Sequence, residues 1–231
     1  MRTELGDVYI KLYDETPVHK KNFLKLAKSG FFDGQAFHRI VNHLVIQAGD
    51  PRTKNAYPPT NRDKPYDAGY KLPAEIIDTM AHTYGKLGMA RKDTSLNPKR
   101  KSSSSQFYIV TGRRMTVAGL DSIEENRSGV LQSQLYQSYK SQLDSGWTSL
   151  NFVQYMDSVG FEDYKYPAHQ EKAYYTKGGV PSLDNEYTIF GEVLKGMNIV
   201  DQIEILPTNK YDMPNQPFRI LEMKVLSSEE Q

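Results

Sequence analysis

The sequence predicts a mainly β fold, a barrel or sandwich of short strands, with a helical block inserted into it. Short apolar segments separated by turn-forming residues occupy the first half of the chain and return at its end, a pattern that favours an antiparallel β architecture. Between Gly112 and Gly179 the sequence becomes polar and helical in character. Because long insertions in surface loops cost little free energy, we interpret this block as an insertion between two strands.

The chain is expected to open with a strand and a helix. Residues 8–13 alternate apolar and more polar side chains, the period of a half-buried strand. Thr16 is a suitable N-cap, and Pro17 then occupies the first helical position. Gly30 is placed to end this helix, since glycine adopts the left-handed conformation that terminates many helices.

The following segments predict more strands, with loops between them. Residues 37–49 suggest two short strands separated near Asn42-His43, and residues 51–71 are rich in turn formers and predict a long irregular loop. Residues 91–104, which include a serine run, are expected to form an exposed loop, and residues 197–203 a helix. Further strands are expected at 72–77, 86–90, 106–111, 187–193 and 218–225.

The helical block contains three candidate helices. Apolar residues recur at four-residue steps over 131–143 and again over 149–159, and a third helix is predicted over 167–175. We assign residues 113–180 to a helical insertion within a single domain that spans 1–231. The insertion is interpreted as a packing element, and a partner-docking or substrate-gating role is the alternative.

Composition excludes several classes of function. The 29 basic and 28 acidic residues give a formal net charge of +1, whereas a nucleic-acid or anionic-membrane partner would favour a cationic excess. The chain has no Cys, which rules out disulfides, thiolate nucleophiles and cysteine-based zinc sites. Its five His lack metal-ligand spacing, so neither a metal nor a cofactor is expected. No apolar run approaches the length that spans a bilayer.

Several segments together resemble the cyclophilin family, and the texture is closest to that of bacterial cyclophilins with a helical insert. Each segment alone is weak, but their order and spacing are specific and they cover the chain outside the helical block. The segments are Leu5-Gly6-Asp7, Asn22-Phe23-Leu24, Gly30-Phe31-Phe32-Asp33-Gly34, Phe37-His38-Arg39-Ile40, Ile46-Gln47-Ala48-Gly49-Asp50-Pro51, Gly88-Met89-Ala90-Arg91, Ser105-Gln106-Phe107-Tyr108-Ile109, Leu183-Asp184 and Tyr187-Thr188-Ile189-Phe190-Gly191-Glu192-Val193.

The resemblance implies both a fold and an activity. The fold is a closed eight-stranded antiparallel barrel capped by two helices, with the active groove on its outer face. The activity is that of a peptidyl-prolyl cis/trans isomerase, or rotamase, which accelerates rotation of Xaa-Pro bonds and assists protein folding as a chaperone does. Proline-containing polypeptides are the implied partners, and we expect a monomer.

The resemblance also assigns the site. Arg39 matches the family's catalytic arginine, and Gln47 matches the glutamine that holds the substrate backbone. The implied substrate-binding residues are Phe37, His38, Leu44, Val45, Ala90, Arg91, Gln106, Tyr108, Leu183 and Tyr187. The chemistry needs no nucleophile or metal, because the catalyst has only to bind the twisted amide better than either planar isomer. An always-charged guanidinium suits that task as a donor to the prolyl nitrogen.

Some positions depart from the family pattern. Leu44 stands where a phenylalanine is usual and Val45 where a methionine is usual, while Tyr108 replaces a phenylalanine and adds a hydroxyl that needs a partner. Ser182 stands where many members carry a tryptophan that contacts cyclosporin, so weak cyclosporin binding is expected. These departures keep open the alternative of a proline-peptide binding module with little catalysis.

The compartment rests on the resemblance alone. Bacterial relatives with such an insert look like exported or envelope-anchored proteins, which favours the periplasm or cell envelope for a chain trimmed of its signal. A cytoplasmic protein is the alternative, because the sequence carries no recognisable export signal at its start.

Overall fold

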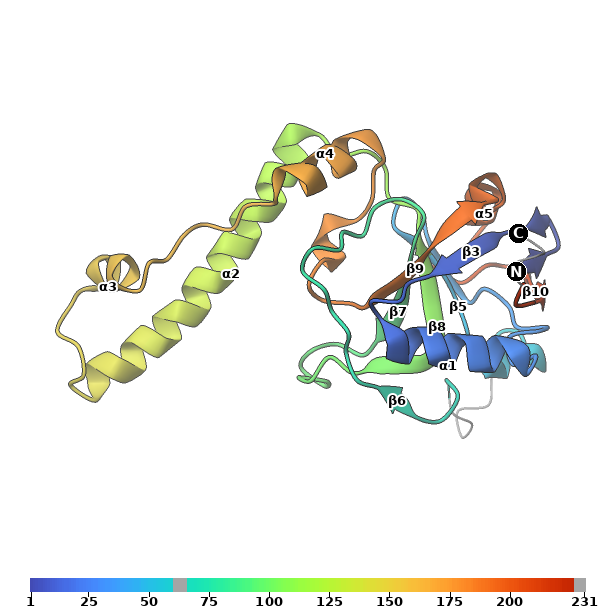
Figure 1. The fold of residues 1–231 in the computed structure, drawn as a ribbon, viewed down its shortest axis with the longest axis horizontal. Helices are drawn as coiled ribbons and strands as arrows, with labels where there is room; N and C mark the ends of the chain where they lie inside the picture. The colour runs from blue at the N-terminus through green and yellow to red at the C-terminus, as the bar shows by residue number, and fades with distance from the viewer. Residues whose placement is uncertain (60–65, 227–231) are drawn as a thin grey trace. The chain divides into compact units, whose positions relative to one another are not determined.

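The computed structural model describes residues 1–59 and 66–226, in two compact units (Figure 1). The first unit is formed by Met1–Arg114 and Lys177–Gln231, and the second by Met115–Thr176. The second unit therefore interrupts the first in sequence. The assignment of 113–180 as an insertion within one domain stays a prediction.

The first unit consists of antiparallel β-sheets, which confirms the predicted mainly β class. A seven-stranded sheet has the order β3-β9-β7-β8-β5-β4, with β6 paired to β8, and a three-stranded sheet has the order β10-β1-β2. The strands are β1 (Arg2–Thr3), β2 (Gly6–Asp7), β3 (Tyr9–Leu12), β4 (Arg39–Val41), β5 (Val45–Ala48), β6 (Lys71–Leu72), β7 (Lys86–Arg91), β8 (Ser102–Val110), β9 (Ile189–Lys195) and β10 (Ile220–Glu222).

The closed eight-stranded barrel is not confirmed. Among the described residues, the strand pairing runs as an open path from β3 to β4, and β10-β1-β2 form a separate sheet. Register shifts interrupt the pairing between Tyr9 and Ile10 and between Leu87 and Gly88. Such bulges disrupt the hydrogen-bond ladder and bend the strand. The strand pairing among the described residues therefore comprises two sheets, and neither is recorded as closed.

Two helices bury apolar side chains against the core of the first unit. In α1 (Pro17–Lys28), Phe23 packs its ring 5.3 Å from that of Phe107 and 5.2 Å from that of Phe190, measured between centroids. In α5 (Met197–Glu204), Val200 and Ile203 are fully buried. Figure 1 shows α1 running along the sheet beside β8. The helices at 17–28 and 197–204 thus confirm two predicted elements.

Local signals around α1 are confirmed in part. Thr16 is the N-cap residue, but its side chain makes no capping hydrogen bond. Gly30, with φ of +67°, follows the C-cap as predicted, and its amide donates to the carbonyl of Ala27 at 3.0 Å. The helix therefore begins at proline and ends at a left-handed glycine.

The serine run corrects one prediction. β8 begins at Ser102, so residues 102–105 are buried strand rather than exposed loop. The Ser105 hydroxyl donates to the carbonyl of Gly49 at 2.8 Å, and the side-chain Nδ2 of Asn22 donates to the carbonyl of Ser104 at 2.7 Å. Buried polar groups are tolerated when hydrogen-bonded. These partners lie far away in sequence, which is why the run looked solvent-exposed.

The segment between β5 and β7 also differs from the expectation. A strand was expected over 72–77, but β6 ends at Leu72, before Pro73. Proline cannot donate to a strand ladder, which explains the early end. The predicted 51–71 loop contains a 3₁₀ turn, η1 (Pro51–Lys54), and its residues 60–65 lie outside the described part of the chain.

The second unit consists of three helices, as predicted. They are α2 (Val117–Asp144), α3 (Phe152–Ser158) and α4 (Ala168–Thr176). Thr116 caps α2 by accepting from the amide of Gly119, and Asn151 begins α3 with a capping box. No helix in the described ranges is long and apolar enough to cross a membrane.

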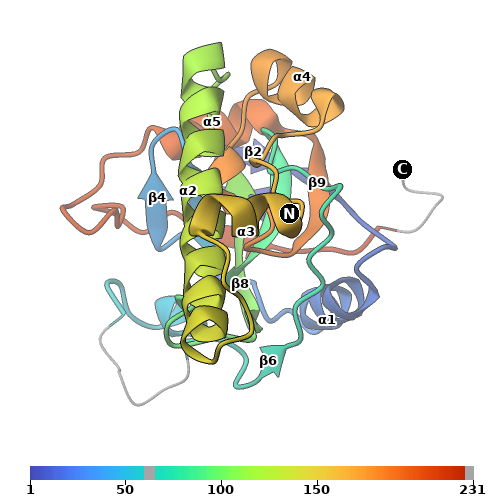
Figure 2. The same cartoon turned by 90° about the vertical axis from the view of Figure 1, so that its left-hand side faces the viewer.

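Aromatic packing connects the helices of the second unit. Near the end of α2, the Tyr139 ring lies 5.4 Å from that of Phe152 and 5.3 Å from that of Tyr155 on α3. Near the beginning of α2, the amide of Met115 donates to the carbonyl of Tyr174 on α4 at 3.1 Å. Figure 1 shows α4 near the beginning of α2 and α3 beside its second half, and Figure 2 shows α3 crossing α2.

Candidate functional site

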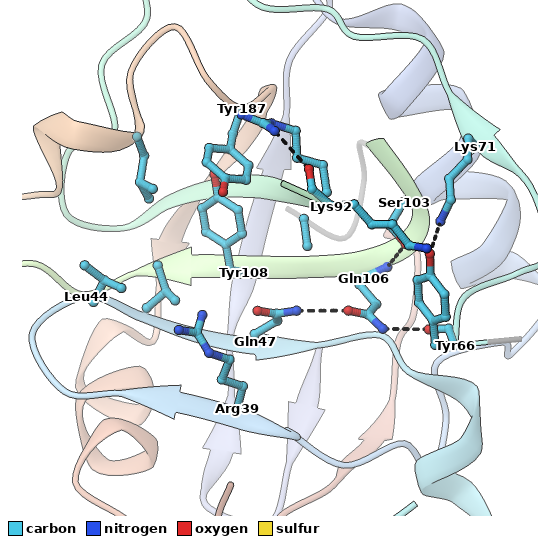
Figure 3. A pocket seen from close by; sticks show the side chains of 14 residues that line it. Arg39, Leu44, Gln47, Tyr66, Lys71, Lys92, Ser103, Gln106, Tyr108 and Tyr187 are labelled. Carbon is cyan, nitrogen blue, oxygen red and sulfur yellow. Dashed lines mark hydrogen bonds between the residues drawn. The ribbon is translucent and has the colours of Figure 1, made fainter. Parts of the chain in front are cut away.

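A pocket of about 280 Å³ opens on the first unit, where β4, β5, β7 and β8 meet the segment after the 3₁₀ turn η2 (Pro181–Leu183). Apart from Phe37 and His38, every residue predicted for the site lines this pocket (Figure 3). The lining residues are Arg39, Leu44, Val45, Gln47, Tyr66, Lys71, Ala90, Arg91, Lys92, Ser103, Gln106, Tyr108, Leu183 and Tyr187.

Arg39 and Gln47 face the pocket from a hairpin. The turn at Asn42–Leu44 joins β4 to β5 as predicted, and Arg39 is the register partner of Gln47. Directly opposed residues of antiparallel strands project to the same face, and Figure 3 shows both side chains beside the pocket. Asp212 Oδ2 lies 3.6 Å from Arg39 Nε. Within the described part of the chain, no hydrogen bond involves the two terminal guanidinium nitrogens of Arg39, which are therefore available to a ligand.

A chain of amide groups fixes the orientation of Gln47. Gln106 Nε2 donates to the backbone carbonyl of Tyr66 at 2.7 Å, so its Oε1 faces Gln47 and accepts from Gln47 Nε2 at 2.9 Å. A backbone carbonyl can only accept, and this determines both amide orientations. Among the described residues, Gln47 Oε1 has no hydrogen-bond donor, so it remains available as an acceptor beside Arg39.

The wall of the pocket is apolar. Val45 and Tyr108 are buried in a small cluster against which Leu44, Ala90, Leu183 and Tyr187 pack. The rings of Tyr108 and Tyr187 meet edge to face, with centroids 5.9 Å apart. The Arg91 guanidinium lies 4.6 Å above the Tyr187 ring and is held by Glu186 at 2.5 Å. The pocket therefore places the half-exposed Arg39 beside an apolar wall.

The hydroxyl of Tyr108 has the partner that the sequence required. It lies 2.9 Å from His82 Nε2, and His82 Nδ1 lies 2.8 Å from Asp184 Oδ1. Burial raises the pKa of Tyr108 well above its usual range, and the neighbouring Tyr187 and Asp184 act in the same direction. The phenol is therefore protonated at neutral pH. His82 was not among the predicted site residues.

Phe37 and His38 lie outside the pocket lining. Phe37 is fully buried, 6.0 Å from Phe218 between ring centroids. The backbone amide of His38 donates to the carbonyl of Gln47 at 3.0 Å, which places it in the scaffold of the hairpin. Burial lowers the pKa of His38 to about 4. The imidazole is thus neutral at pH 7 and supports the strand that carries Arg39.

Four lining residues were missed from the sequence: Tyr66, Lys71, Lys92 and Ser103. Lys71 Nζ lies 3.0 Å from the Tyr66 hydroxyl, and Lys92 Nζ lies 5.5 Å from the Tyr66 ring centroid. All four lie in segments interpreted largely as loops. The only local signal was the spacing of Asp67 and Lys71, a pair separated by four residues that forms an ion pair.

Within the ranges that the structure describes, no group of three or more His, Cys, Asp or Glu side chains is placed to hold a metal ion. The arrangement offers instead a cationic donor, an oriented amide acceptor and an apolar slot. These features suit a ligand that has a compact hydrocarbon ring next to peptide groups.

Comparison with known proteins identifies the family. The profile described as "Cyclophilin type peptidyl-prolyl cis-trans isomerase/CLD" matches residues 1–225. The chain therefore belongs to the cyclophilin-type peptidyl-prolyl cis-trans isomerase family, as the sequence segments predicted.

Bacterial relatives carry an isomerase name, and a solved structure shares the fold. A Staphylococcus epidermidis protein, provisionally named a peptidyl-prolyl cis-trans isomerase, is 27% identical over 215 residues, covering 93% of this chain and 84% of the relative. A Staphylococcus aureus protein of the same name is 27% identical over 216 residues, with the same coverage. A Cryptosporidium parvum cyclophilin-type isomerase has a similar fold, with a TM-score of 0.59 at 21% identity over 98% of this chain and 96% of that one.

Proposed function

We propose that this chain catalyses cis/trans isomerisation of Xaa-Pro bonds, with Arg39 and Gln47 as its catalytic residues. The observation that carries the proposal is the register pairing of Arg39 with Gln47 on one face of a hairpin, beside an apolar pocket. Family membership supports the same activity. The Cryptosporidium relative was crystallised in the presence of the dipeptide Ala-Pro, which is the kind of ligand proposed for this pocket.

The barrier to be lowered is electronic. Delocalisation of the nitrogen lone pair into the carbonyl makes rotation about the amide cost about 18–20 kcal/mol. A group that binds the twisted amide better than either planar form accelerates rotation. The free guanidinium nitrogens of Arg39 donate toward the prolyl nitrogen, whose lone pair is localised only in the twisted state. This interaction is therefore strongest at the transition state.

The remaining residues hold the substrate while one end rotates. The apolar wall of Leu44, Val45 and Tyr108 anchors the pyrrolidine ring. Gln47 Oε1 accepts from a peptide N–H next to the proline and fixes that end of the substrate. Positioning of this kind contributes by fixing the reacting geometry in advance.

A protease-coupled assay on a proline peptide tests the proposal. The wild type is expected to accelerate isomerisation, and Arg39→Ala to lower kcat/KM by about 100-fold, the typical cost of losing one transition-state donor. Arg2→Ala is the matched control, because Arg2 lies outside the pocket and pairs with Glu222 on the surface. A wild type that leaves the uncatalysed rate unchanged would refute the proposal, and full activity in Arg39→Ala would refute the role of Arg39.

The second candidate is a proline-peptide binding module with little catalysis. Leu44 and Val45 favour it, because both lie in the pocket wall and offer no aromatic ring for proline to pack against. Peptide binding without any acceleration would leave only this alternative. With Ser182 at the expected tryptophan position, we further propose that cyclosporin binds weakly; the monomeric state and the periplasm or cell envelope as the compartment stay predictions.

A further inference from the structure

Behind the apolar wall lies a buried chain of three polar side chains. Asp184, His82 and Tyr108 have exposed fractions of 2%, 0% and 4%. Tyr108 lines the pocket, whereas His82 and Asp184 do not. Buried polar groups are costly unless each finds a partner, and here each side chain supplies a partner for the next.

The hydrogen bonds assign the direction of this chain. Asp184 Oδ1 lies 2.7 Å from the backbone N of His82, from which it accepts, and 2.8 Å from His82 Nδ1. A carboxylate accepts only, so Nδ1 carries the imidazole proton. Nε2 lies 2.9 Å from the Tyr108 hydroxyl, which donates to it when Nδ1 carries the only ring proton.

Gly88 leaves the space that the Tyr108 side chain needs to contact His82. It is the register partner of Tyr108 on the neighbouring strand β7, and the tyrosine ring crosses directly over it. A Cβ at residue 88 would lie 2.2 Å from Tyr108 Cζ and 2.3 Å from its hydroxyl oxygen. Only a residue without a side chain allows the ring to lie flat and extend to His82.

We propose that His82 and Asp184 are positioning residues that fix the Tyr108 ring as the wall of the proline pocket. Asp184 sets the imidazole tautomer and orientation, and His82 then holds the phenol. The hydroxyl is directed into the protein and not toward the ligand, so the ring presents hydrocarbon to a pyrrolidine. The inference rests on the proposed function, because it takes the pocket as the site that holds proline.

Variants of His82 test the proposal through peptide affinity. In His82→Asn the side-chain amide lies where Nδ1 was, so it keeps the hydrogen bond to Asp184 and loses the one to the Tyr108 hydroxyl. In His82→Gln the longer side chain extends far enough to accept a hydrogen bond from the Tyr108 hydroxyl. The dissociation constant of an Ala-Ala-Pro-Phe peptide, measured by NMR titration, is expected to rise about fivefold in His82→Asn, consistent with one lost hydrogen bond, and to recover in His82→Gln. KM follows this pattern while kcat changes little.

A double-mutant comparison isolates the hydrogen bond. Tyr108→Phe removes the same interaction from the other side, so His82→Asn combined with Tyr108→Phe should bind no more weakly than either single variant. His19→Asn is the matched control. His19 is a fully buried histidine paired with a carboxylate, 2.6 Å from Glu75, and lies outside the pocket lining. It should lower the melting temperature without changing peptide affinity.

The outcomes separate this inference from the proposed function. Equal peptide affinity in wild type, His82→Asn and His82→Gln would overturn the positioning role, even if both variants melt earlier. A wild type that binds the peptide without accelerating isomerisation would refute only the isomerase, since affinities still test the positioning role. A wild type that does not bind the peptide would overturn both.

Discussion

At the scale of single residues, the two proposed catalytic side chains, Arg39 and Gln47, are held by different contacts. Arg39 is half-exposed, with Asp212 near Nε only, so its terminal nitrogens keep their donors. Gln47 has its amide orientation imposed by Gln106 and, through it, by a backbone carbonyl. The hydrogen bonds that orient Gln47 involve only uncharged groups, so they do not compete with Arg39 for the substrate. A half-exposed guanidinium thus lies beside an oriented amide acceptor.

His38 makes stability depend on pH. Its pKa is lowered to about 4 by burial, while in the unfolded chain it returns to about 6.5. Between these values the unfolded state binds more protons, so the free energy of unfolding falls as the pH drops from about 6.5 to 4, by up to about 1.4 kcal/mol per pH unit for one proton. Burial lowers the pKa of His19 as well, with the same sign.

Urea unfolding at pH 7 and pH 5 measures this effect. His38→Asn removes the ionisation and should make the pH dependence shallower. His169→Asn is the control, since His169 is exposed on α4 and should leave the dependence unchanged. An equal change in the free energy of unfolding between pH 7 and pH 5 for wild type and His38→Asn would contradict the lowered pKa of His38.

At the scale of elements, two glycines in different settings predict opposite effects of one substitution. Gly88→Ala on β7 would force its Cβ into the Tyr108 ring, which should cost about 1–3 kcal/mol by overpacking and weaken binding of proline peptides. Gly129→Ala in the middle of α2 meets nothing within 4 Å. It should stabilise the helix by about 0.5–1 kcal/mol, because alanine has the higher helix propensity.

Thermal unfolding followed by circular dichroism, together with peptide titration, checks both glycine variants. If Gly88→Ala kept the wild-type stability and peptide affinity, the Tyr108 ring would have room to move. The close approach of that ring to residue 88 would then determine neither stability nor binding. If Gly129→Ala lowered the stability of the helical unit, the conclusion that a Cβ at residue 129 meets no neighbouring atom would be contradicted.

At the scale of the whole molecule, the two ends of the helical unit connect to neighbouring points of the first unit. The amide of Gly179 donates to the carbonyl of Arg113 at 3.2 Å, and a Cβ on Gly178 would lie 2.6 Å from the backbone of Arg113. Replacing residues 115–176 with a short Gly-Ser linker should therefore close the gap without strain. Short loops between close ends carry a small entropy cost.

The shortened protein should fold and keep proline-peptide binding and isomerisation within about twofold of the full chain, because all lining residues belong to the first unit. Peptide titration and the isomerase assay measure this, and light scattering compares the oligomeric states. A folded, shortened protein that has lost peptide binding would contradict the interpretation of the insertion as a packing element and favour a gating role.

The sequence predicted the site best where the relevant information was local. The eight-residue separation of Arg39 and Gln47, with turn formers between them, specifies a hairpin that places both on one face. Helix caps and stops at Pro17 and Gly30 are local too, and these boundaries agree with the structure.

Features that depend on distant partners could not be predicted in this way. Ser102–Ser105 looked exposed because their hydrogen-bond partners lie far along the chain. The link between His82 and Tyr108 requires the register of β7 on β8, and the placement of Tyr66 and Lys71 depends on a loop with no periodic pattern. Bulges such as that at Tyr9 likewise cannot be predicted from the alternation of apolar and polar residues alone.

Two-dimensional exchange spectroscopy on an Ala-Ala-Pro-Phe peptide tests the central claim most directly, because it detects binding and cis/trans exchange in one sample. With catalytic amounts of wild-type protein, we predict exchange cross-peaks between the cis and trans forms. With Arg39→Ala, these cross-peaks should vanish while the peptide signals still shift on binding. Cross-peaks of wild-type intensity with Arg39→Ala, or none with the wild type, would contradict the account.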